Sequence, residues 1–412
     1  MNTAWGATAD TRATIHCMNF DPRLSKNRKS QRLKASRRIA AASSQSSLLE
    51  EPPPALPLHP FLRSEEDSIS VLHPDEFSPE KIFARLQEGQ EVGLEKPWRW
   101  DQALRLYGAL KREVETRHGT PQSFPEDLQL RAIRHEILSR LWVLIQEGKV
   151  QIRGAPPIGW LSSTYGNRRG WLRFSDVLGL NGAWQWYLRG IRFPYLPWTL
   201  HPWYGVYFPT RWEHLELLDS WLSRWPEKEH VEVALDLGCG CGVLSLYLCK
   251  HLPRRTMIWA TDLNPAAVQG FQADLQRLGL QDQVRVVQAD MIPPDLQNLD
   301  LILCNPPWLP GPVRSVIEAG IYYEEGFFDR LFTQVSKALR PGGTFVLLFS
   351  NFAQVSGLTA EHPILLQLRN HPELVGGIAG EVSVRPPRKR TYPWLRAIRR
   401  RERIQLWVLK RK

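Results

Sequence analysis

The sequence has few cysteines and lacks long apolar runs. Its 412 residues include five cysteines, none in a Cys-x-x-Cys pair, which is typical of free thiols in a reducing compartment. No apolar stretch is long enough to cross a bilayer, and the N-terminus lacks the apolar core of a secretory signal. Cys239 and Cys241 have no second pair nearby, so no metal site is predicted. We therefore expect a cytoplasmic protein without a membrane partner.

Acidic residues are scarce at both ends of the chain. Residues 1–49 carry a net charge of +7 and residues 385–412 carry +11. The whole chain also carries +11, so the part between the two ends is mildly acidic, at −7. Two concentrated basic patches on an acidic body indicate a polyanionic partner, such as a nucleic acid.

The first 60 residues have the composition of a disordered basic arm. They are rich in serine, arginine and lysine, and a proline-rich stretch over 52–60 then forms a stiff linker. The alternative is an organelle transit peptide, because such peptides are also basic, rich in serine and poor in acidic residues. In that case the protein would act in an organelle.

Residues 61–200 are expected to form a mainly helical accessory domain that recognises the substrate. Apolar residues recur at three- and four-residue spacing over Trp98–His118 and Glu126–Gly148, as in amphipathic helices. Ten of the seventeen tryptophans lie between Trp142 and Trp225, with arginines among them. We favour a tryptophan-rich core, because most tryptophans are largely buried. The alternative is a clamp that stacks on nucleic acid bases.

Residues 201–412 are expected to form a doubly wound, mostly parallel α/β sheet. Short apolar runs predict strands over Val231–Leu237, Met257–Asp262, Gln283–Ala289, Leu299–Cys304, Thr344–Ser350, Ile378–Val384 and Ile404–Leu409. Helices are predicted between them, from Val243 onward and over Ala266–Leu278 and Gly326–Leu339. Buried strands that alternate with helices are typical of this fold class.

Acidic and glycine residues follow the first three strands of this region. The run Asp236-Leu237-Gly238-Cys239-Gly240-Cys241-Gly242 follows the first strand, and its glycines allow a tight turn and a close approach to a ligand. Asp262 ends the second strand, where a carboxylate can accept hydrogen bonds from ribose hydroxyls. Asp290 ends the third and could accept from an adenine amino group, with Met291 against the ring. A dinucleotide enzyme would share most of these features.

The most specific motif is Asn305-Pro306-Pro307-Trp308. It follows the apolar run Leu299–Cys304, and two prolines fix the backbone where this strand ends. Ligands bind at that end of the strands in open parallel sheets. If Asn305 Oδ1 and the Pro306 carbonyl accept the two hydrogens of a planar amino group, they orient its nitrogen and stabilise the positive charge that develops. Trp308 would stack on the substrate.

Taken in order, these motifs resemble the class I S-adenosylmethionine-dependent methyltransferases. The closest pattern is the branch with Asn-Pro-Pro-aromatic, which modifies amino groups of bases or of glutamine side chains. The resemblance covers about residues 200–412 and implies a seven-stranded sheet with S-adenosylmethionine as the cofactor. It places the cofactor against Asp236, Gly238, Cys239, Gly240, Gly242, Asp262, Leu263, Asp290, Met291 and Asn305. It places catalysis at Asn305, Pro306, Pro307 and Trp308. The two cysteines and Trp308, where Tyr or Phe is commoner, depart from the family pattern.

The resemblance also suggests where the substrate lies. Gly205–Arg211 is similar to the proline-containing loop that such enzymes place before the glycine run, so Pro209 and Arg211 are candidate substrate residues. The seventh strand of the family is antiparallel, so the connection Arg385–Arg403 should emerge at the same edge as Asn305. Its two basic runs, with Tyr392 and Trp394 between them, are a candidate RNA clamp: Arg388, Lys389, Arg390, Arg399, Arg400 and Arg401. The alternative is a solvated basic tail.

Four residues have two interpretations each. Glu213 and His214 could line the cofactor pocket or begin a solvated helix, and Tyr322 and Tyr323 could form a substrate lid or pack inside. The resemblance implies an N-methyltransferase, and we expect its substrate to be a nucleobase in ribosomal or transfer RNA. The alternatives are a glutamine N5-methyltransferase for a translation-related, ribosome-associated protein, and an RNA-binding scaffold with a vestigial methyltransferase fold.

Overall fold

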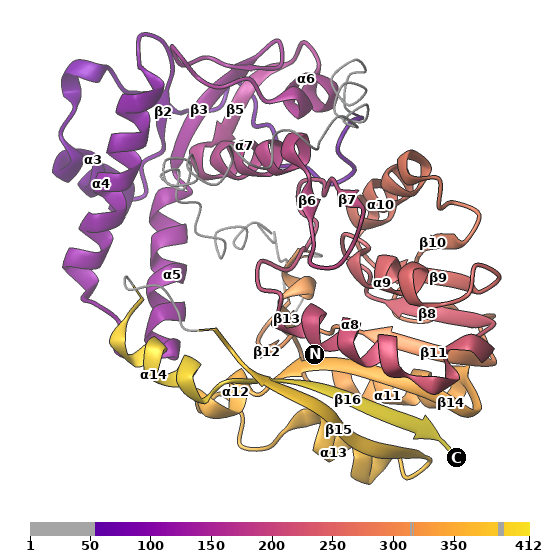
Figure 1. Cartoon of the computed structure of the whole chain (residues 1–412). Coiled ribbons are helices and arrows are strands. Elements are labelled where there is room, and N and C mark those ends of the chain that lie inside the picture. The colour runs from indigo at the N-terminus through magenta and orange to yellow at the C-terminus, as the bar shows by residue number, and fades with distance from the viewer. Residues whose placement is uncertain (1–53, 314, 316, 386–390) are drawn as a thin grey trace, which may run out of the picture. The chain divides into compact units, whose positions relative to one another are not determined.

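The computed structural model describes residues 54–313, 315, 317–385 and 391–412 (Figure 1). Most of the expected basic arm, residues 1–60, lies outside these residues. The chain divides into two compact units, and each is described by itself. The first contains Ile191–Lys412, and the second contains Pro125–Gly190 together with residues 54–121. The division therefore lies ten residues before the expected boundary at residue 200.

The first unit is built on a seven-stranded sheet with the order β10-β9-β8-β11-β14-β16-β15. Its strands are β8 (Val233–Leu237), β9 (Met257–Asp262), β10 (Val284–Gln288), β11 (Leu299–Cys304), β14 (Leu339–Ser350), β15 (Leu374–Ser383) and β16 (Arg403–Arg411). Neighbouring strands from β10 to β14 are parallel, and β16 is antiparallel to both β14 and β15. The predicted mostly parallel, seven-stranded sheet is confirmed.

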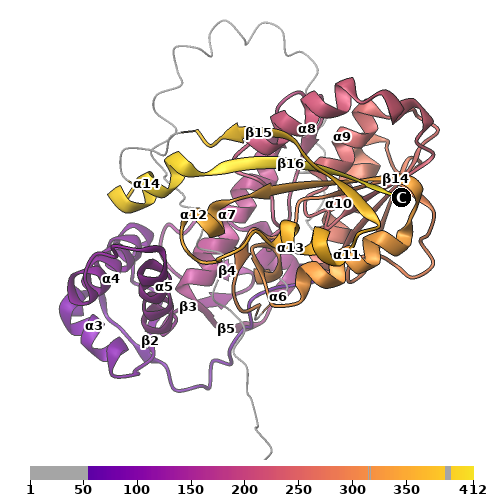
Figure 2. The ribbon, with the colours of Figure 1, turned by 90° about the horizontal axis from the view of Figure 1, so that it is seen from below.

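Helices cover both faces of this sheet. The helices of the unit are α8 (Glu213–Arg224), α9 (Val243–His251), α10 (Pro265–Leu278), α11 (Phe327–Ala338), α12 (Phe352–Val355), α13 (Pro363–Asn370) and α14 (Pro393–Arg401). Figures 1 and 2 show α8 and α9 on one face and α11 and α13 on the other. The α10 helix shows how residues at the ends of a helix mark its bounds. Asn264 Oδ1 accepts a hydrogen bond from the Ala266 amide at 2.9 Å at its start, and Gly279 ends it with φ +67°.

The strand directions bring several chain segments to one edge of the sheet, which we call the carboxyl edge. The parallel strands β8, β9, β11 and β14 all end there. The antiparallel strand β16 begins there instead, because Ile404 pairs with Ser350 and Arg403 pairs with Ser383. The predicted position of the connection between β15 and β16, on the same edge as Asn305, therefore agrees with the strand pairing.

Short elements complete the first unit. Two pairs of two-residue strands are present: β6 (Ile191–Arg192) with β7 (Thr199–Leu200), and β12 (Leu309–Pro310) with β13 (Tyr322–Tyr323). Two 3-10 turns are η4 (Pro226–His230) and η5 (Glu318–Gly320). Among the described residues, no helix of either unit combines the length and the apolar character needed to span a membrane.

The second unit combines helices with a sheet that we did not expect. Its helices are α3 (Pro79–Gln87), α4 (Trp100–His118), α5 (Phe124–Leu138), α6 (Gly159–Tyr165) and α7 (Phe174–Arg189), with η3 (Pro74–Glu76). Its five strands are β1 (Ser70–Val71), β2 (Val92–Leu94), β3 (Leu141–Gln146), β4 (Lys149–Val150) and β5 (Arg169–Arg173). The sequence thus predicted the helices of this unit but not its sheet.

The strand β3 explains the difference. The helix expected over Glu126–Gly148 ends at Leu138, and the apolar run from Leu141 to Ile145 forms a strand that is buried at every position. This strand pairs in parallel with β2 and antiparallel with β5, so a strand of branched and aromatic residues fits between them. Trp142, Trp160, Trp171 and Trp184 are all buried, which agrees with the interpretation of a tryptophan-rich core.

Candidate active site

The glycine loop between β8 and α9 lies at the carboxyl edge and needs its glycines. Gly238, Gly240 and Gly242 have φ values of +73°, +52° and +84°, which side-chain-bearing residues rarely adopt. A Cβ atom on Gly240 would lie 2.9 Å from the Tyr207 carbonyl oxygen, and one on Gly242 would lie 2.2 Å from the Phe271 ring. By contrast, a Cβ atom on Gly238 would meet no described atom within 4 Å. The loop therefore packs closely on one side and is open at Gly238.

The two cysteines of the loop are structural. Both are buried, and burial raises the pKa of each thiol, so the thiols stay protonated and unreactive. Their amides hold the loop in place: Cys239 N donates to the Thr261 carbonyl at 2.9 Å, and Cys241 N donates to the Tyr207 carbonyl at 3.1 Å. Within the described part of the chain, no cluster of three or more His, Cys, Asp or Glu residues could hold a metal ion.

Asp236 is a fully buried carboxyl group with one unpaired oxygen. Its Oδ2 atom accepts hydrogen bonds from the Ser245 amide at 2.8 Å and from Ser245 Oγ at 2.6 Å. Its Oδ1 atom is buried and has no hydrogen-bond partner among the described residues. Burial raises the pKa of Asp236 to about 7, although the two hydrogen bonds from Ser245 favour the ionised form. Such an oxygen is suited to a ligand that supplies a cationic or N–H group.

Asp262 connects the glycine loop to the end of β9. Its Oδ2 accepts from the Gly240 amide and its Oδ1 accepts from the Asn264 amide, each at 2.8 Å. Burial raises the pKa of this carboxyl, although both amides favour the ionised form. Each oxygen keeps a lone pair that can accept from a ligand hydroxyl. The next residue, Leu263, is exposed and could contact a ligand.

Asp290 lies in a more open position than Asp236 and Asp262. It is exposed, and its Oδ2 accepts from Arg330 Nη1 at 3.0 Å, a partner that the sequence did not suggest. The next residue, Met291, is buried and has a φ of +66°, which is strained for a residue with a side chain. The expected adenine-contacting pair thus consists of an exposed acid and a buried, conformationally constrained methionine.

Trp308 contacts Asn305 directly, a contact that the sequence did not predict. Its indole Nε1 donates to Asn305 Oδ1 at 3.1 Å and to the Leu348 carbonyl at 3.2 Å. The ring also meets the His214 ring edge-on, with centroids 5.6 Å apart. His214 is buried without a hydrogen-bond partner in the described chain, and burial lowers its pKa to about 4, so it is a neutral packing group.

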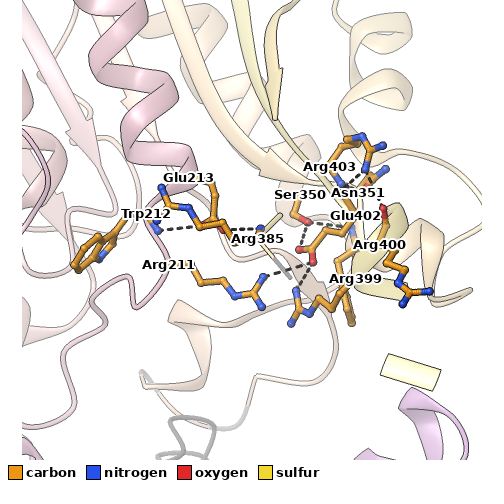
Figure 3. Close-up of polar contacts among 11 residues, drawn as sticks. Arg211, Trp212, Glu213, Ser350, Asn351, Arg385, Arg399, Arg400, Glu402 and Arg403 are labelled. Carbon is orange, nitrogen blue, oxygen red and sulfur yellow. Dashed lines mark hydrogen bonds and ion pairs between the residues drawn. The ribbon is translucent and has the colours of Figure 1, made fainter. Parts of the chain in front are cut away.

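The expected substrate residues Arg211 and Arg399 meet at one buried carboxylate. Glu402 is 1% exposed and lies at the end of α14, just before β16. Its Oε1 accepts from Ser350 Oγ at 2.8 Å, and its Oε2 accepts from Arg399 Nη1 at 2.5 Å. Arg211 Nη1 lies 3.8 Å from the same Oε2 atom (Figure 3). Burial and the neighbouring Arg399 lower the pKa of Arg211.

The other basic candidates are not gathered at Glu402. Arg400 and Arg401 are exposed, and Arg401 Nη2 donates to the Val355 carbonyl at 2.7 Å. Arg388, Lys389 and Arg390 lie outside the described residues. Pro209 is buried in the loop that precedes Arg211. Glu402 and Ser350 were missed, and the one sequence signal for Glu402 is that it is the single acidic residue in a strongly basic segment.

Three weaker candidates have structural contacts. Glu213 accepts from the Trp212 amide at 3.1 Å and from the Arg385 amide at 2.9 Å, so it ties the start of α8 to the end of the β15 region. Tyr323 is buried and packs edge-on against Phe328, with centroids 4.9 Å apart. Tyr322 is half-buried beside it in β13. These contacts favour packing over a lid.

Comparisons with known proteins agree with this geometry. The family described as "Methyltransferase small domain" matches residues 218–363, which include the glycine loop and Asn305–Trp308. "Methyltransferase HEMK2" of Mus musculus is 30% identical over 152 residues, covering 35% of this chain and 71% of that protein.

Two bacterial relatives have names that state a substrate. "Release factor glutamine methyltransferase" of Moorella thermoacetica is 31% identical over 144 residues, covering 32% of this chain and 50% of that protein. "tRNA1(Val) (adenine(37)-N6)-methyltransferase" of Haemophilus influenzae is 30% identical over 90 residues, covering 21% and 39%. The chain thus spans about half the length, or less, of the first curated relatives it matches. On the strength of the mouse relative and the matching family model, the chain belongs to the methyltransferase small family of class I S-adenosylmethionine-dependent methyltransferases.

Proposed function

We propose that this protein transfers a methyl group from S-adenosylmethionine to an amino nitrogen of a nucleobase in ribosomal or transfer RNA. The observation that supports it most is the position of Asn305. It follows β11 at the carboxyl edge, where β8 and β9 place Asp236 and Asp262. The basic connection between β15 and β16 returns to the same edge.

The residues of the glycine loop and of β9 fit the cofactor. The buried, unpaired Oδ1 of Asp236 suits the ammonium group of its methionine part, and the lone pairs of Asp262 suit the ribose hydroxyls. The open space beside Gly238 admits the ligand close to the backbone. When bound, S-adenosylmethionine supplies an electrophilic methyl group.

Asn305 would act on the amino group of the substrate. The lone pair of a base amino group is delocalised into the ring, so the nitrogen is a poor nucleophile until it is oriented. Asn305 Oδ1 and the Pro306 carbonyl would accept its two hydrogens and stabilise the developing positive charge. The Trp308 N–H group uses one lone pair of Oδ1 and fixes the direction of the amide, so the second lone pair remains for the substrate.

We favour a nucleic acid as the substrate because the segment near the site is strongly basic. Residues 385–412 carry a net charge of +11, and this segment includes the connection at the carboxyl edge. A second candidate is the amide of a glutamine in a translation-related protein, as in the name of the Moorella relative. An amide nitrogen has the same two hydrogens and the same delocalised lone pair, so the same acceptors would serve it.

The test uses the full chain with isotopically labelled S-adenosylmethionine. Ribosomal and transfer RNA from cells that lack this protein, and a release factor purified from them, are offered separately, and the labelled nucleoside or peptide is identified by mass spectrometry. Label in an amino-modified nucleoside supports the proposal, and label in glutamine supports the second candidate. Cofactor binding without turnover on either would indicate a vestigial enzyme.

The assignment of Asn305 has its own variant. We expect Asn305→Ala to lower kcat by about 10²–10³-fold, as for loss of one group that stabilises transition-state charge, with little change in cofactor affinity. Asn370→Ala, which alters an exposed asparagine at the end of α13, should leave both unchanged. Full turnover by Asn305→Ala would contradict the catalytic assignment.

A further inference from the structure

The first unit has an open groove beside the hairpin of β6 and β7, outside the candidate cofactor residues. Its volume is about 730 Å³, which is in the range of small-ligand sites. The lining includes two exposed aromatic rings, two arginines and one carboxylate: Tyr195, Trp212, Arg192, Arg385 and Glu216. The groove therefore combines flat apolar faces with a net positive charge.

The hairpin that forms one wall is firmly anchored. The Tyr247 hydroxyl of α9 donates to the Pro194 carbonyl at 2.5 Å. Arg277 of α10 donates to the Thr199 carbonyl, and Asp274 Oδ2 accepts from the His201 amide at 2.8 Å. The backbone of the loop between β6 and β7 is thus fixed to the core of the unit at both ends.

Tyr195 is displayed at the tip of this anchored loop. Its φ of +60° is strained for a bulky residue, and its side chain is 62% exposed. Lys250 Nζ lies 5.7 Å from the centroid of its ring. Strained backbone that holds a large ring in solvent costs free energy without burying apolar surface, so a binding partner for the ring would account for it.

Trp212 supplies the second exposed ring. It is 36% exposed and lies at the start of α8, where its amide donates to Glu213. Figure 3 shows the Trp212 indole pointing away from Glu402, whereas the neighbouring Arg211 points toward it. Trp212, which lines the groove, is thus the direct sequence neighbour of Arg211, whose guanidinium lies near Glu402 at the carboxyl edge.

The cationic groups of the groove are accessible. Arg192 Nε donates to the Leu196 carbonyl at 3.5 Å, and its two terminal nitrogens have no partner in the described chain. Arg385 pairs with Glu216, yet its side chain remains 61% exposed. Since Glu216 is the one carboxylate of the lining, a phosphate would meet a net charge of +1 there.

We propose that this groove binds a nucleotide of a single-stranded RNA segment that flanks the methylated base; this rests on the proposed function. A base stacks on Tyr195 or Trp212, and Arg192 and Arg385 contact the phosphates on either side. Stacking on aromatic faces with flanking arginines is how proteins hold single-stranded RNA. A glutamine side chain offers neither a ring nor a negative charge, so it would not engage this set of groups.

The test measures binding of a fluorescein-labelled decamer of uridine to the full chain by anisotropy. We expect Tyr195→Ala combined with Trp212→Ala to weaken binding about tenfold or more, since stacking contributes about 1–3 kcal/mol per base. The matched variants Leu365→Ala and Arg369→Ala, both on α13 and outside the groove, should bind as the parent protein does. Tyr195→Phe with Trp212→Phe should restore most of the affinity, which separates stacking from misfolding.

An abasic decamer and a peptide complete the experiment. The abasic strand keeps the phosphates without the bases, so the alanine variant should hardly change its binding, whereas Arg192→Gln with Arg385→Gln should weaken both strands and reduce their salt dependence. Equal loss on both strands in the alanine variant would overturn the stacking assignment. A glutamine-containing peptide that binds through Tyr195 and Trp212 more tightly than the decamer would overturn the choice of RNA.

Turnover distinguishes this inference from the proposed function. If the parent protein methylates RNA and the alanine variant binds and methylates it equally well, the groove assignment is wrong and the function stands. If no RNA is methylated but the decamer still binds through the two rings, the function is wrong and the groove remains an RNA-binding site.

Discussion

The candidate cofactor side and the candidate substrate side of the site are built in different ways. The cofactor side comes from consecutive strands β8, β9 and β10, and its acids Asp236 and Asp262 are held by nearby backbone amides. The substrate side joins distant parts of the chain, as in the contact between Glu213 and Arg385, which lie 172 residues apart. Contacts between segments that are close in sequence thus position the cofactor residues. The substrate residues come together only because β16 pairs antiparallel with its neighbours in the sheet.

The largest expected effect tests the close packing of the cofactor side. Gly242→Ala should lower the free energy of unfolding by about 3 kcal/mol or more, because the new Cβ is strained at φ +84° and would lie 2.2 Å from Phe271. Gly279→Ala is the matched control, with φ +67° and no atom within 4 Å, and should cost about 1 kcal/mol. Urea denaturation measures both. Equal losses of stability in the two variants would show that the positive φ, and not the close contact with Phe271, is what requires glycine at position 242.

The next effect tests whether one carboxylate supports the substrate side. Glu402→Gln leaves Arg211 and Arg399 facing each other, and we expect a loss of about 2 kcal/mol in the free energy of unfolding, since Glu402 is buried but Arg399 is partly solvated. Glu361→Gln removes a carboxylate from an exposed pair with Arg369 and should cost less than about 1 kcal/mol. A Glu402 variant as stable as this control would contradict the buried role.

A third effect concerns the pH dependence of cofactor binding. Burial raises the pKa of Asp236 to about 7, so below that pH the carboxyl must lose its proton before it can pair with a cationic ligand group. Affinity for S-adenosylmethionine should therefore rise with pH by up to about tenfold per unit below pH 7, and level off above it. Calorimetry from pH 5 to pH 8.5 measures this.

Two variants locate the titrating group. Asp236→Asn should flatten the pH profile, whereas Asp290→Asn, at an exposed acid, should preserve it. A profile that persists in Asp236→Asn would assign the titration to another residue and weaken the view that the cofactor side depends on desolvated acids.

The smallest effect concerns the contact between the two sides, at Trp308 and Asn305. Trp308→Phe keeps an aromatic ring and removes the N–H donor, so kcat should fall by about 2–10-fold, the value of one hydrogen bond, with little change in KM. His214→Phe keeps an edge-on ring against Trp308 and should have little effect. Initial rates on the identified substrate measure both. An unchanged kcat in Trp308→Phe would show that the indole N–H does not contribute to catalysis, so that only stacking would remain as a role for Trp308.

The sequence was sufficient for the elements that have local signals. The seven strands of the main sheet were predicted, most of them because each contains a short apolar run, and α10 was predicted because Asn264 and Pro265 mark its start. Strand β3 was missed because an apolar run directly follows the α5 helix without a glycine or proline between them. The pairing of Glu402 with Ser350, 52 residues away, depends on the register of β14 and β16, which periodicity cannot give. The positive φ of Tyr195 has no local signal either.

The side chains of Arg211 and Trp212 point in opposite directions. The number of residues between Pro209 and Glu213 therefore matters more than the identity of each residue. A conservative substitution at either position leaves the other side chain in place. An insertion or deletion of one residue between Pro209 and Glu213 would exchange them, bringing an indole toward Glu402 and a guanidinium toward Tyr195. We therefore expect this segment to tolerate conservative point substitutions in natural or selected variants, while changes in its length are eliminated.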